Sequence, residues 1–210
     1  MLAAIFLNGS HPSIRIVKKL LKEDCHIIAA DGGADYLHSK KIIPNVIIGD
    51  MDSLSSHATE YYRKKDVRFI RIKEQETTDF EKSLNYCKSA GYKEVIVLGA
   101  TSNRPDHTMN NFSVMKRFRN YFDVRIFTDE YEIFYASKSI GFTYRKNETL
   151  SMMAMPKAVG VSTKGLKYRL NDETLEFGIR EGSLNESVSH EISISYKSGT
   201  LLIFRKHFIN

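Results

Sequence analysis

The sequence predicts an α/β protein with an N-terminal doubly wound, mostly parallel sheet and a smaller C-terminal all-β, sandwich-like domain. Over about the first 130 residues, six short apolar runs alternate with segments of helical periodicity, as in proteins built from strand–helix–strand units. Several of these runs are apolar at consecutive positions, which is typical of parallel strands covered on both faces. After about residue 135 the helical periodicity stops and short strand-like runs continue. The expected domains are residues 1–135 and 136–210.

The apolar runs of the first domain are its expected strands: Met1–Leu7, His26–Ala30, Val46–Ile48, Val67–Ile72, Glu94–Leu98 and Val124–Phe127. A helix after the first strand is expected from apolar residues at helical spacing, namely Ile14, Val17, Leu20 and Leu21. The same spacing predicts a helix before the fifth strand, through Phe80, Leu84 and Cys87. Pro105 suits the first position of a further helix. In open sheets of this kind, ligands bind beyond the carboxyl ends of the strands.

The second domain is expected to be antiparallel, because its runs alternate apolar and polar residues and are separated by turn residues. Its expected strands are Tyr131–Tyr135 at the boundary, Gly141–Tyr144, Thr149–Met155, Glu191–Tyr196 and Leu201–Phe204. The segment Lys197–Thr200 is expected to form the turn between the last two strands.

Composition narrows the class of protein. The 210 residues carry a net charge of +6, which suits an anionic partner, but the basic residues are spread along both parts without a dense basic arm. Two cysteines cannot build the disulfide framework of a small secreted scaffold. No apolar stretch approaches the roughly 20 residues of a membrane helix, and the apolar start has no basic n-region. We therefore expect a cytoplasmic protein with no membrane partner and no nucleic-acid partner.

Aspartates follow two of the expected strands. Asp31 follows the second strand, and Asp50 and Asp52 follow the third. In an extended segment, side chains two residues apart point to the same side, so Asp50 and Asp52 can project together. Two such carboxylates repel each other unless a cation lies between them, and magnesium prefers oxygen ligands of this kind. Loop aspartates also serve as helix caps and turn residues, but this pattern favours a metal site.

The segment Thr77–Leu84 carries a helix start. Thr78 followed three residues later by Glu81 predicts a capping box, which places Asp79 in the first helical turn. Asp79 and Lys82 then share one face. Taken alone, this pair is interpreted as an ordinary surface ion pair on an amphipathic helix.

A third cluster follows the fifth strand. Arg104 lies at the mouth of the helix expected from Pro105, and His107 and Asn111 lie one turn apart on its surface. A helix start with a nearby arginine favours an anion, so this cluster can cradle a nucleotide phosphate. In the alternative interpretation, Asp106 serves the helix dipole while Arg104 and His107 are solvated.

Other motifs of catalysis are missing from the sequence. It holds no G-x-x-x-x-G-K-[ST], no G-x-G-x-x-G and no C-x-x-C. The remaining histidines have no metal-like spacing and are expected to be structural or exposed: His11, His26, His38, His57, His190 and His207.

Taken together and in order, the clusters resemble one family, the thiamine pyrophosphokinases (thiamine diphosphokinases). The matching segments span nearly the whole chain: Asp31–Asp35, Pro44–Ser53, Gln75 with Thr78–Lys82, Arg104–His107 with Asn111, Gly165–Tyr168, Gly182–Glu186 and Ser198–Leu202. Two departures stand out. Thr101–Asn103 occupies a stretch that is usually glycine-rich in the family, and Leu184 occupies the position of a serine, with Ser183 one residue early.

The resemblance implies transfer of the diphosphoryl group of ATP to the hydroxyl of thiamine, which gives thiamine diphosphate and AMP. Magnesium is then expected on Asp31, Asp50, Asp52 and Asp79, of which Asp50, Asp52 and Asp79 are the expected catalytic residues. The residues expected to hold ATP are Lys82, Arg104, Asp106, His107 and Asn111. The residues expected to contact thiamine are Gln75, Asp79, Ser183 and Asn185. The resemblance also implies a homodimer in which the β domain of one chain completes the site of the other.

Two other functions remain to be weighed. Val46–Ser53 superficially resembles the apolar strand and D-x-D motif of haloacid dehalogenase-type phosphohydrolases, but Gly49 separates strand from aspartate and no Asp-Asp pair occurs. A basic nucleic-acid-binding module predicts clustered Lys and Arg among aromatic platforms, and the even spread of charge argues against it.

Overall fold

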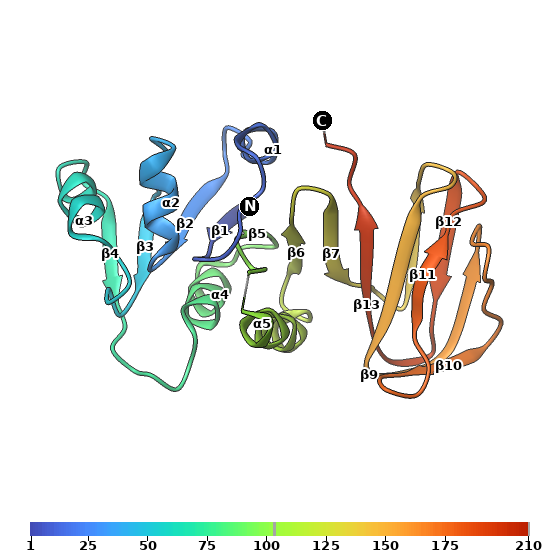
Figure 1. Ribbon diagram of the computed structural model, residues 1–210. Coiled ribbons are helices and arrows are strands. Elements are labelled where there is room, and N and C mark those ends of the chain that lie inside the picture. The colour runs from blue at the N-terminus through green and yellow to red at the C-terminus, as the bar shows by residue number, and fades with distance from the viewer. Residues whose placement is uncertain (103, 210) are drawn as a thin grey trace. The chain divides into compact units, whose positions relative to one another are not determined.

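The computed structural model describes residues 1–102 and 104–209, and its chain divides into two compact units (Figure 1). The α/β unit comprises Met1–Asp129 together with Ile209, and the β unit comprises Glu130–Phe208. The sequence places the boundary at 135/136, after the strand Tyr131–Tyr135, whereas in the structure this strand belongs to the β unit. Of the Thr101–Asn103 departure, Asn103 lies outside the described residues.

The α/β unit contains all six strands expected from the sequence: β1 (Leu2–Phe6), β2 (His26–Ala30), β3 (Val46–Gly49), β4 (Arg68–Arg71), β5 (Glu94–Leu98) and β6 (Asp123–Phe127). They pair in the order β4-β3-β2-β1-β5-β6, and every pair is parallel. The chain moves outward from β1 to β4 and then returns to β5 on the other side of β1. The strand order therefore reverses between β1 and β5, which is where such sheets bind ligands.

Five helices connect these strands: α1 (Ile14–Leu20), α2 (Gly33–Ser39), α3 (Ser56–Arg63), α4 (Asp79–Ala90) and α5 (Pro105–Phe118). Phe6 of β1 packs in one hydrophobic cluster with Val17 of α1, Leu37 of α2 and Tyr62 of α3. The neighbouring Ile5 is also fully buried and points to the opposite face of the sheet, where α4 contacts β1, β2 and β3. Both faces are covered, so the predicted doubly wound sheet is confirmed (Figure 1).

The helix that carries Asp79 begins and ends where its local sequence indicates. Thr78 is the N-cap of α4, and its hydroxyl accepts the Glu81 backbone N–H at 3.3 Å. The helix ends at Gly91, whose φ of 77° lies in the left-handed region that glycine tolerates. Phe80 and Leu84 are buried as their spacing predicts. The capped start holds Asp79 in the first turn.

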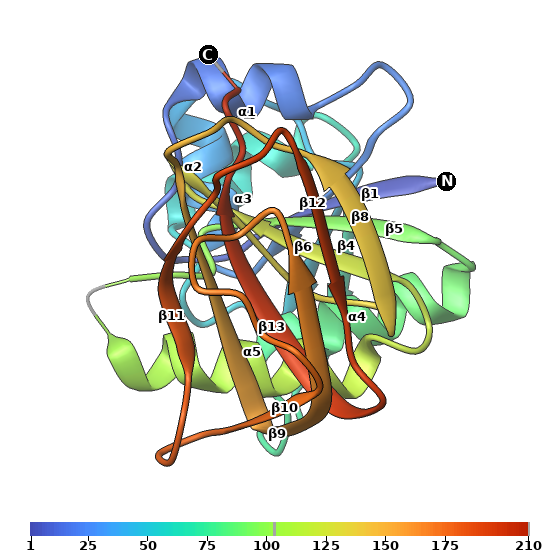
Figure 2. The ribbon, with the colours of Figure 1, turned by 90° about the vertical axis from the view of Figure 1, so that its right-hand side faces the viewer.

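The β unit contains seven strands among the described residues: β7 (Tyr131–Tyr135), β8 (Ser139–Thr143), β9 (Thr149–Lys164), β10 (Glu173–Glu176), β11 (Gly182–Glu186), β12 (Glu191–Ser195) and β13 (Ser198–Lys206). All described pairings are antiparallel, and the long strand β9 pairs with β13, β12, β10 and β11 (Figure 2). The five strands expected from the sequence are present, so the antiparallel β domain is confirmed. The strands β10 and β11 were not expected, because these short polar segments lack alternation.

The turn expected at Lys197–Thr200 is shorter in the structure. Ser198 and Gly199 already belong to β13, where Gly199 pairs with Ala158 of β9. Gly199 has a φ of 89°, and a Cβ there would collide with the Lys157 carbonyl. Both β12 and β13 pair with β9, so the last two predicted strands meet a common partner.

Candidate active site

A cleft of about 760 Å³ opens in the α/β unit at the carboxyl ends of its strands. It lies at the reversal between β1 and β5, because Leu7–Gly9 after β1 and Gly99 and Ala100 after β5 both line it. Asp31 after β2 and Asp50 after β3 line it as well. The remaining described lining residues are Ala30, Gly32, Ser53, Gln75–Phe80, Lys82, Ser102, Arg104, Asp106, His107, Asn110 and Asn111. The volume is that of a small-molecule site.

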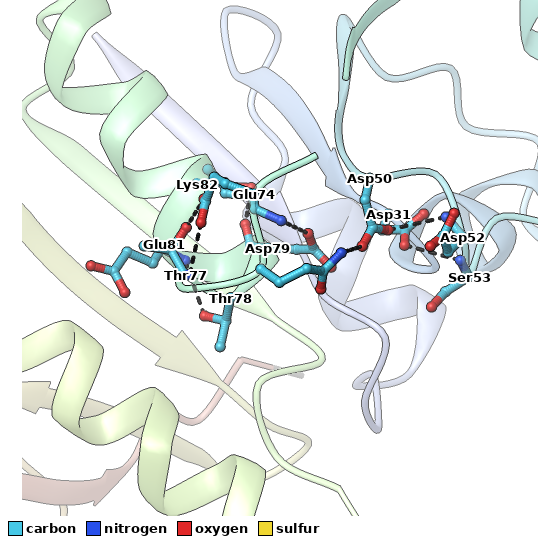
Figure 3. Close-up of polar contacts among 12 residues, drawn as sticks. Asp31, Asp50, Asp52, Ser53, Glu74, Thr77, Thr78, Asp79, Glu81 and Lys82 are labelled. Atoms are coloured by element: carbon cyan, nitrogen blue, oxygen red, sulfur yellow. Dashed lines mark hydrogen bonds and ion pairs between the residues drawn. The ribbon is translucent and has the colours of Figure 1, made fainter. Parts of the chain in front are cut away.

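Asp31 is the most buried carboxylate of the cleft, with 2% of its surface exposed. Its backbone is left-handed, with a φ of 41°, and Figure 3 shows its side chain beside Asp50 and Ser53. Oδ2 accepts the Ser53 backbone N–H at 3.0 Å, whereas Oδ1 is buried without a hydrogen-bond partner among the described atoms. Burial raises the pKa of Asp31, and the charges of Asp79 and Asp50 raise it further. This oxygen has unused capacity to bind a cation.

Asp50 is held by hydrogen bonds on both carboxylate oxygens. Oδ2 accepts Nε2–H of Gln75 at 2.8 Å, and Oδ1 accepts the Asp52 backbone N–H at 3.1 Å. The Gln75 bond is the main cause of a lowered pKa for Asp50, and the Asp52 bond adds to it. The expected geometry of Asp50 and Asp52 was wrong: Met51 is left-handed with a φ of 70°, so the segment turns instead of running extended. Asp52 is exposed and outside the described cleft lining.

Asp79 faces these carboxylates from the start of α4. Its Oδ1 lies 3.3 Å from Nζ of Lys82, whose side chain is only 3% exposed. The interpretation of this pair as an ordinary surface ion pair was therefore wrong. Burial raises the pKa of Asp79, and Lys82 opposes that rise. A Cβ on Gly49 would lie 2.8 Å from Cβ of Asp31 and 3.2 Å from Oδ1 of Asp79. The side chains of Asp31 and Asp79 therefore both lie against Gly49.

The carboxylates of the cleft fit a divalent cation that also binds a substrate phosphate. Among the residues the structure describes, no three His, Cys, Asp or Glu side chains form a complete metal site. The unpartnered oxygen of Asp31 lies among carboxylates whose charges raise its pKa, which is the environment a cation relieves. Magnesium is commonly held by one or two carboxylates plus phosphate oxygens. Asp31, Asp50 and Asp79 supply that donor chemistry.

Another part of the cleft lining comes from the segment at the start of α5. Arg104 makes two bonds to Asp106, from Nε at 3.0 Å and from the guanidinium NH2 group at 2.7 Å. The Arg104 guanidinium lowers the pKa of Asp106 to about 2. His107 is exposed and lines the cleft. Nδ2 of Asn111 donates to the Ala100 carbonyl at 2.8 Å, so Asn111 also ties α5 to the loop after β5.

The sequence did not single out several residues of the cleft. Asn8 and Gly9 follow β1, and a Cβ on Gly9 would lie 2.6 Å from the Thr101 carbonyl. The Ser10 N–H donates to that carbonyl at 2.7 Å, which joins the two loops. The signal that could have found them is their place after the central strand, since strand ends at a reversal form the site. Asn110, on α5, carried no such signal.

The two remaining predicted site residues lie in the β unit. Asn185 is 4% exposed; its Oδ1 accepts the N–H groups of Tyr168 (3.0 Å) and Glu186 (2.9 Å), and its Nδ2 donates to the Tyr168 carbonyl at 2.8 Å. Ser183 is exposed. Leu184 is 77% exposed, with a φ of 54°. The β11–β9 register shifts between Gly182 and Asn185, so a bulge re-aims this segment.

Two further findings concern the chain as a whole. Within residues 1–102 and 104–209, no helix is long and apolar enough to cross a membrane. Cys25 and Cys87 are free thiols, and both are buried.

The fold and the site together define an α/β protein with carboxylates and a buried lysine at its strand reversal, where sheets of this kind bind ligands. Two family models match the chain: "Thiamin pyrophosphokinase, catalytic domain" over residues 17–128 and "Thiamin pyrophosphokinase, vitamin B1 binding domain" over residues 136–201. The chain belongs to the thiamin pyrophosphokinase family and is an ATP-dependent diphosphotransferase. Neither the phosphohydrolase nor the nucleic-acid-binding alternative is supported.

Individual relatives agree with this membership. The chain is 27% identical to thiamin pyrophosphokinase 1 of Caenorhabditis elegans, over 95% of its own length and 86% of the relative. Its fold is similar to the thiamine pyrophosphokinase of Bacillus subtilis, with a TM-score of 0.87 at 18% identity, covering 99% of this chain and 100% of that one. The yeast enzyme gives a TM-score of 0.84 at 20% identity, with 99% and 88% covered.

Proposed function

We propose that the cleft binds ATP with magnesium and that its carboxylates serve transfer of the β,γ-diphosphoryl group to the hydroxyl of thiamine. The observation that carries this proposal is the buried, unpartnered Oδ1 of Asp31, which lies among Asp50 and Asp79 beside the buried Lys82. This set of groups offers carboxylates to a cation and an ammonium group to an anion. Magnesium and the phosphates of ATP supply both.

The proposed roles of the cleft residues follow their charges, with carboxylates for magnesium and basic side chains for the phosphates. Asp31, Asp50 and Asp79 would hold the magnesium, with Asp52 as a further predicted ligand, and the bound ion would neutralise charge on the phosphate oxygens. Lys82, Arg104 and His107 contact phosphates directly. Asp106 holds Arg104 in its orientation through the two-bond pair, and Asn111 holds the loop after β5.

In the proposed transfer, the thiamine hydroxyl oxygen forms a bond to the β-phosphorus while the bond to the α-phosphate oxygen breaks and AMP leaves. The hydroxyl proton passes to the carboxylate of Asp79. Positioning of the two reactants contributes much of the rate in phosphoryl transfer.

Thiamine is proposed to contact Gln75 and Asp79 in the α/β unit, and Ser183 and Asn185 in the β unit. Leu184 offers an exposed apolar side chain at the position where the family resemblance of the sequence implies a serine. The family model for residues 136–201 supports a role for the β unit in binding vitamin B1. We further propose a homodimer in which the β unit of one chain completes the site of the other, and a cytoplasmic location.

The assay measures AMP release from ATP by the purified full chain. We expect AMP and thiamine diphosphate in equal amounts, and only when thiamine, ATP and magnesium are all present. Phosphate release that does not depend on thiamine would contradict the proposal and favour hydrolysis. Absence of product with all three components, from a folded protein, would contradict it as well.

A further inference from the structure

His11, which the sequence left as a structural or exposed residue, lies where the loop after β1, helix α2 and the loop after β5 meet. Its ring stacks on Tyr36 of α2, with centroids 3.7 Å apart and an angle of 5° between the planes. Phe6 of β1 stacks at 5.9 Å from His11 and 6.0 Å from Tyr36. The Tyr36 hydroxyl also donates to the Pro12 carbonyl at 3.4 Å. The loop after β1 is therefore fastened to α2.

The two ring nitrogens of His11 have different surroundings. The ring hydrogen-bonds to the backbone of Gly9 and Leu7, whereas Nε2 is buried without a partner among the described atoms. These backbone contacts favour a ring N–H that faces the loop after β1. Burial lowers the pKa of His11 to about 4, which keeps the ring neutral near neutral pH.

Gly99 brings the third segment, the loop after β5, against the same ring. Its φ is 74°, and a Cβ there would lie 2.7 Å from Nε2 of His11 and would collide with the Leu7 carbonyl. Only glycine allows this approach. Leu7, Gly9 and Gly99 all line the cleft, whereas His11 contacts these segments without being among the described lining residues.

We propose that His11 is a positioning residue for the nucleotide. Its neutral imidazole clamps the loop after β1 to α2 and to the loop after β5, so the wall of the cleft is ordered before ATP binds. A wall ordered in advance spares the ligand the entropy cost of ordering it. The inference rests on the proposed function, since it assigns the nucleotide to this cleft.

The test measures the affinity for the magnesium complex of α,β-methylene-ATP, whose bridge cannot be cleaved, by calorimetry on the full chain. His11→Phe keeps a ring on Tyr36 but removes the donor to the loop, and the Kd is expected to rise at least about tenfold. His11→Asn keeps a side-chain N–H donor beside the loop, and its Kd is expected within about threefold of the unmodified protein. In turnover, His11→Phe raises the KM for ATP and leaves kcat nearly unchanged.

His26→Phe is the matched control. His26, the first residue of β2, also has a buried Nε2 without a partner in the described structure, and it stacks on Tyr86 at 6.2 Å. It lies at the amino end of its strand, away from the cleft, so the Kd is expected to stay unchanged. If His11→Phe does not fold, Tyr36→Leu removes the stack instead and is expected to raise the Kd at least about threefold.

Unchanged affinity in folded His11→Phe, or in Tyr36→Leu where it replaces that variant, overturns the proposal. An equal loss of affinity in His26→Phe also overturns it, because the loss would then reflect lower protein stability and not the position of His11 beside the cleft. If the unmodified protein itself does not bind the analogue, the proposed function fails and the inference fails with it.

Discussion

The cleft of the α/β unit and the segment around Asn185 in the β unit both bury polar side chains, but they differ in how many hydrogen bonds remain unmade. In the cleft, Asp31 Oδ1 has no partner and its pKa is raised by burial and by neighbouring carboxylates. Asn185 makes three bonds, two of them to the backbone of Tyr168. Unmade bonds at a buried group point to a ligand, whereas complete ones point first to a structural role.

Both regions also contain residues with a left-handed backbone, but these residues carry or adjoin different kinds of side chain. Around the cleft, Asp31 and Met51 have φ values of 41° and 70°, so left-handed residues follow both β2 and β3, next to the carboxylates of the cleft. In the β unit, the left-handed Leu184 turns an apolar side chain outward, where it is 77% exposed. Left-handed residues therefore lie beside carboxylates in the α/β unit, whereas in the β unit the left-handed Leu184 carries an exposed apolar side chain.

The largest expected effect is on the carboxylates of the α/β unit. Asp50→Asn and Asp52→Asn each remove a predicted metal ligand but keep its shape, and we expect turnover at saturating magnesium to fall by at least about a thousandfold. Asp66→Asn is the control, because Asp66 is an exposed residue that precedes β4, at the amino ends of the strands and away from the cleft. Steady-state kinetics with circular dichroism to check folding measure this. Near-normal turnover in either variant would remove that residue from the metal site.

The next expected effect tests the proposal that the cleft and the Asn185 segment of two different chains form one site. Asp79→Ala and Asn185→Ala are each expected to be inactive, and mixing them after dissociation should give heterodimers with one intact site. Activity should recover to about half per heterodimer by the dimer's symmetry. Mixed dimers that are demonstrably present yet inactive would place each site within one chain.

A smaller effect is expected on stability when the complete hydrogen bonds of Asn185 are broken. Asn185→Ala leaves the Tyr168 N–H and C=O groups without their buried partner, and we expect the free energy of unfolding to fall by about 1–3 kcal/mol. Urea unfolding measures this, with Ser183→Ala as the neighbouring control. A variant of unchanged stability but raised thiamine KM would show that Asn185 serves the ligand and not the fold.

Replacing Asp31 is expected to stabilise the metal-free protein, whereas replacing Asn185 is expected to destabilise the fold. The pKa of Asp31 is raised in the folded state, so its contribution to stability declines as pH rises through that folded pKa. At neutral pH, Asp31→Asn should therefore raise the Tm of the metal-free protein by about 2–4 °C, while magnesium no longer stabilises it. The gain should vanish toward the ordinary pKa of aspartate. A lower Tm than that of the unmodified protein at neutral pH would contradict the prediction that the buried Asp31 carboxylate destabilises the metal-free protein.

The smallest effect is expected at Ser183, which is exposed beside Leu184. If thiamine is held there by apolar contact, Ser183→Ala should change the thiamine KM by less than about threefold, below a typical net hydrogen bond. A tenfold rise with unchanged folding would show that the bulge between Gly182 and Asn185 has re-aimed Ser183 toward the ligand. Leu184→Ser is the companion variant, since it restores the hydroxyl usual in the family.

Local patterns predicted the elements that depend on neighbouring residues. The alternation of strands and helices predicted all six parallel strands, and Thr78 with Glu81 predicted the start of α4. The place of Asp31 and Asp50 after strands predicted that they face one cleft, since parallel strands end at one edge. Asp35, part of the motif that resembles the family, was not expected to accept the Ser55 N–H at 3.1 Å and so to join α2 to the start of α3.

The sequence by itself determined the α/β and β organisation, the strands that carry the site and the family, because periodicity, capping and motif order are written in short stretches of chain. Only the tertiary structure decided that Lys82 is buried, that Asp31 keeps an unpartnered oxygen, and that His11 lies where the loops after β1 and β5 meet α2. These properties depend on contacts between segments far apart in the chain. Burial and hydrogen-bond partners are set by those contacts, and no local pattern encodes them.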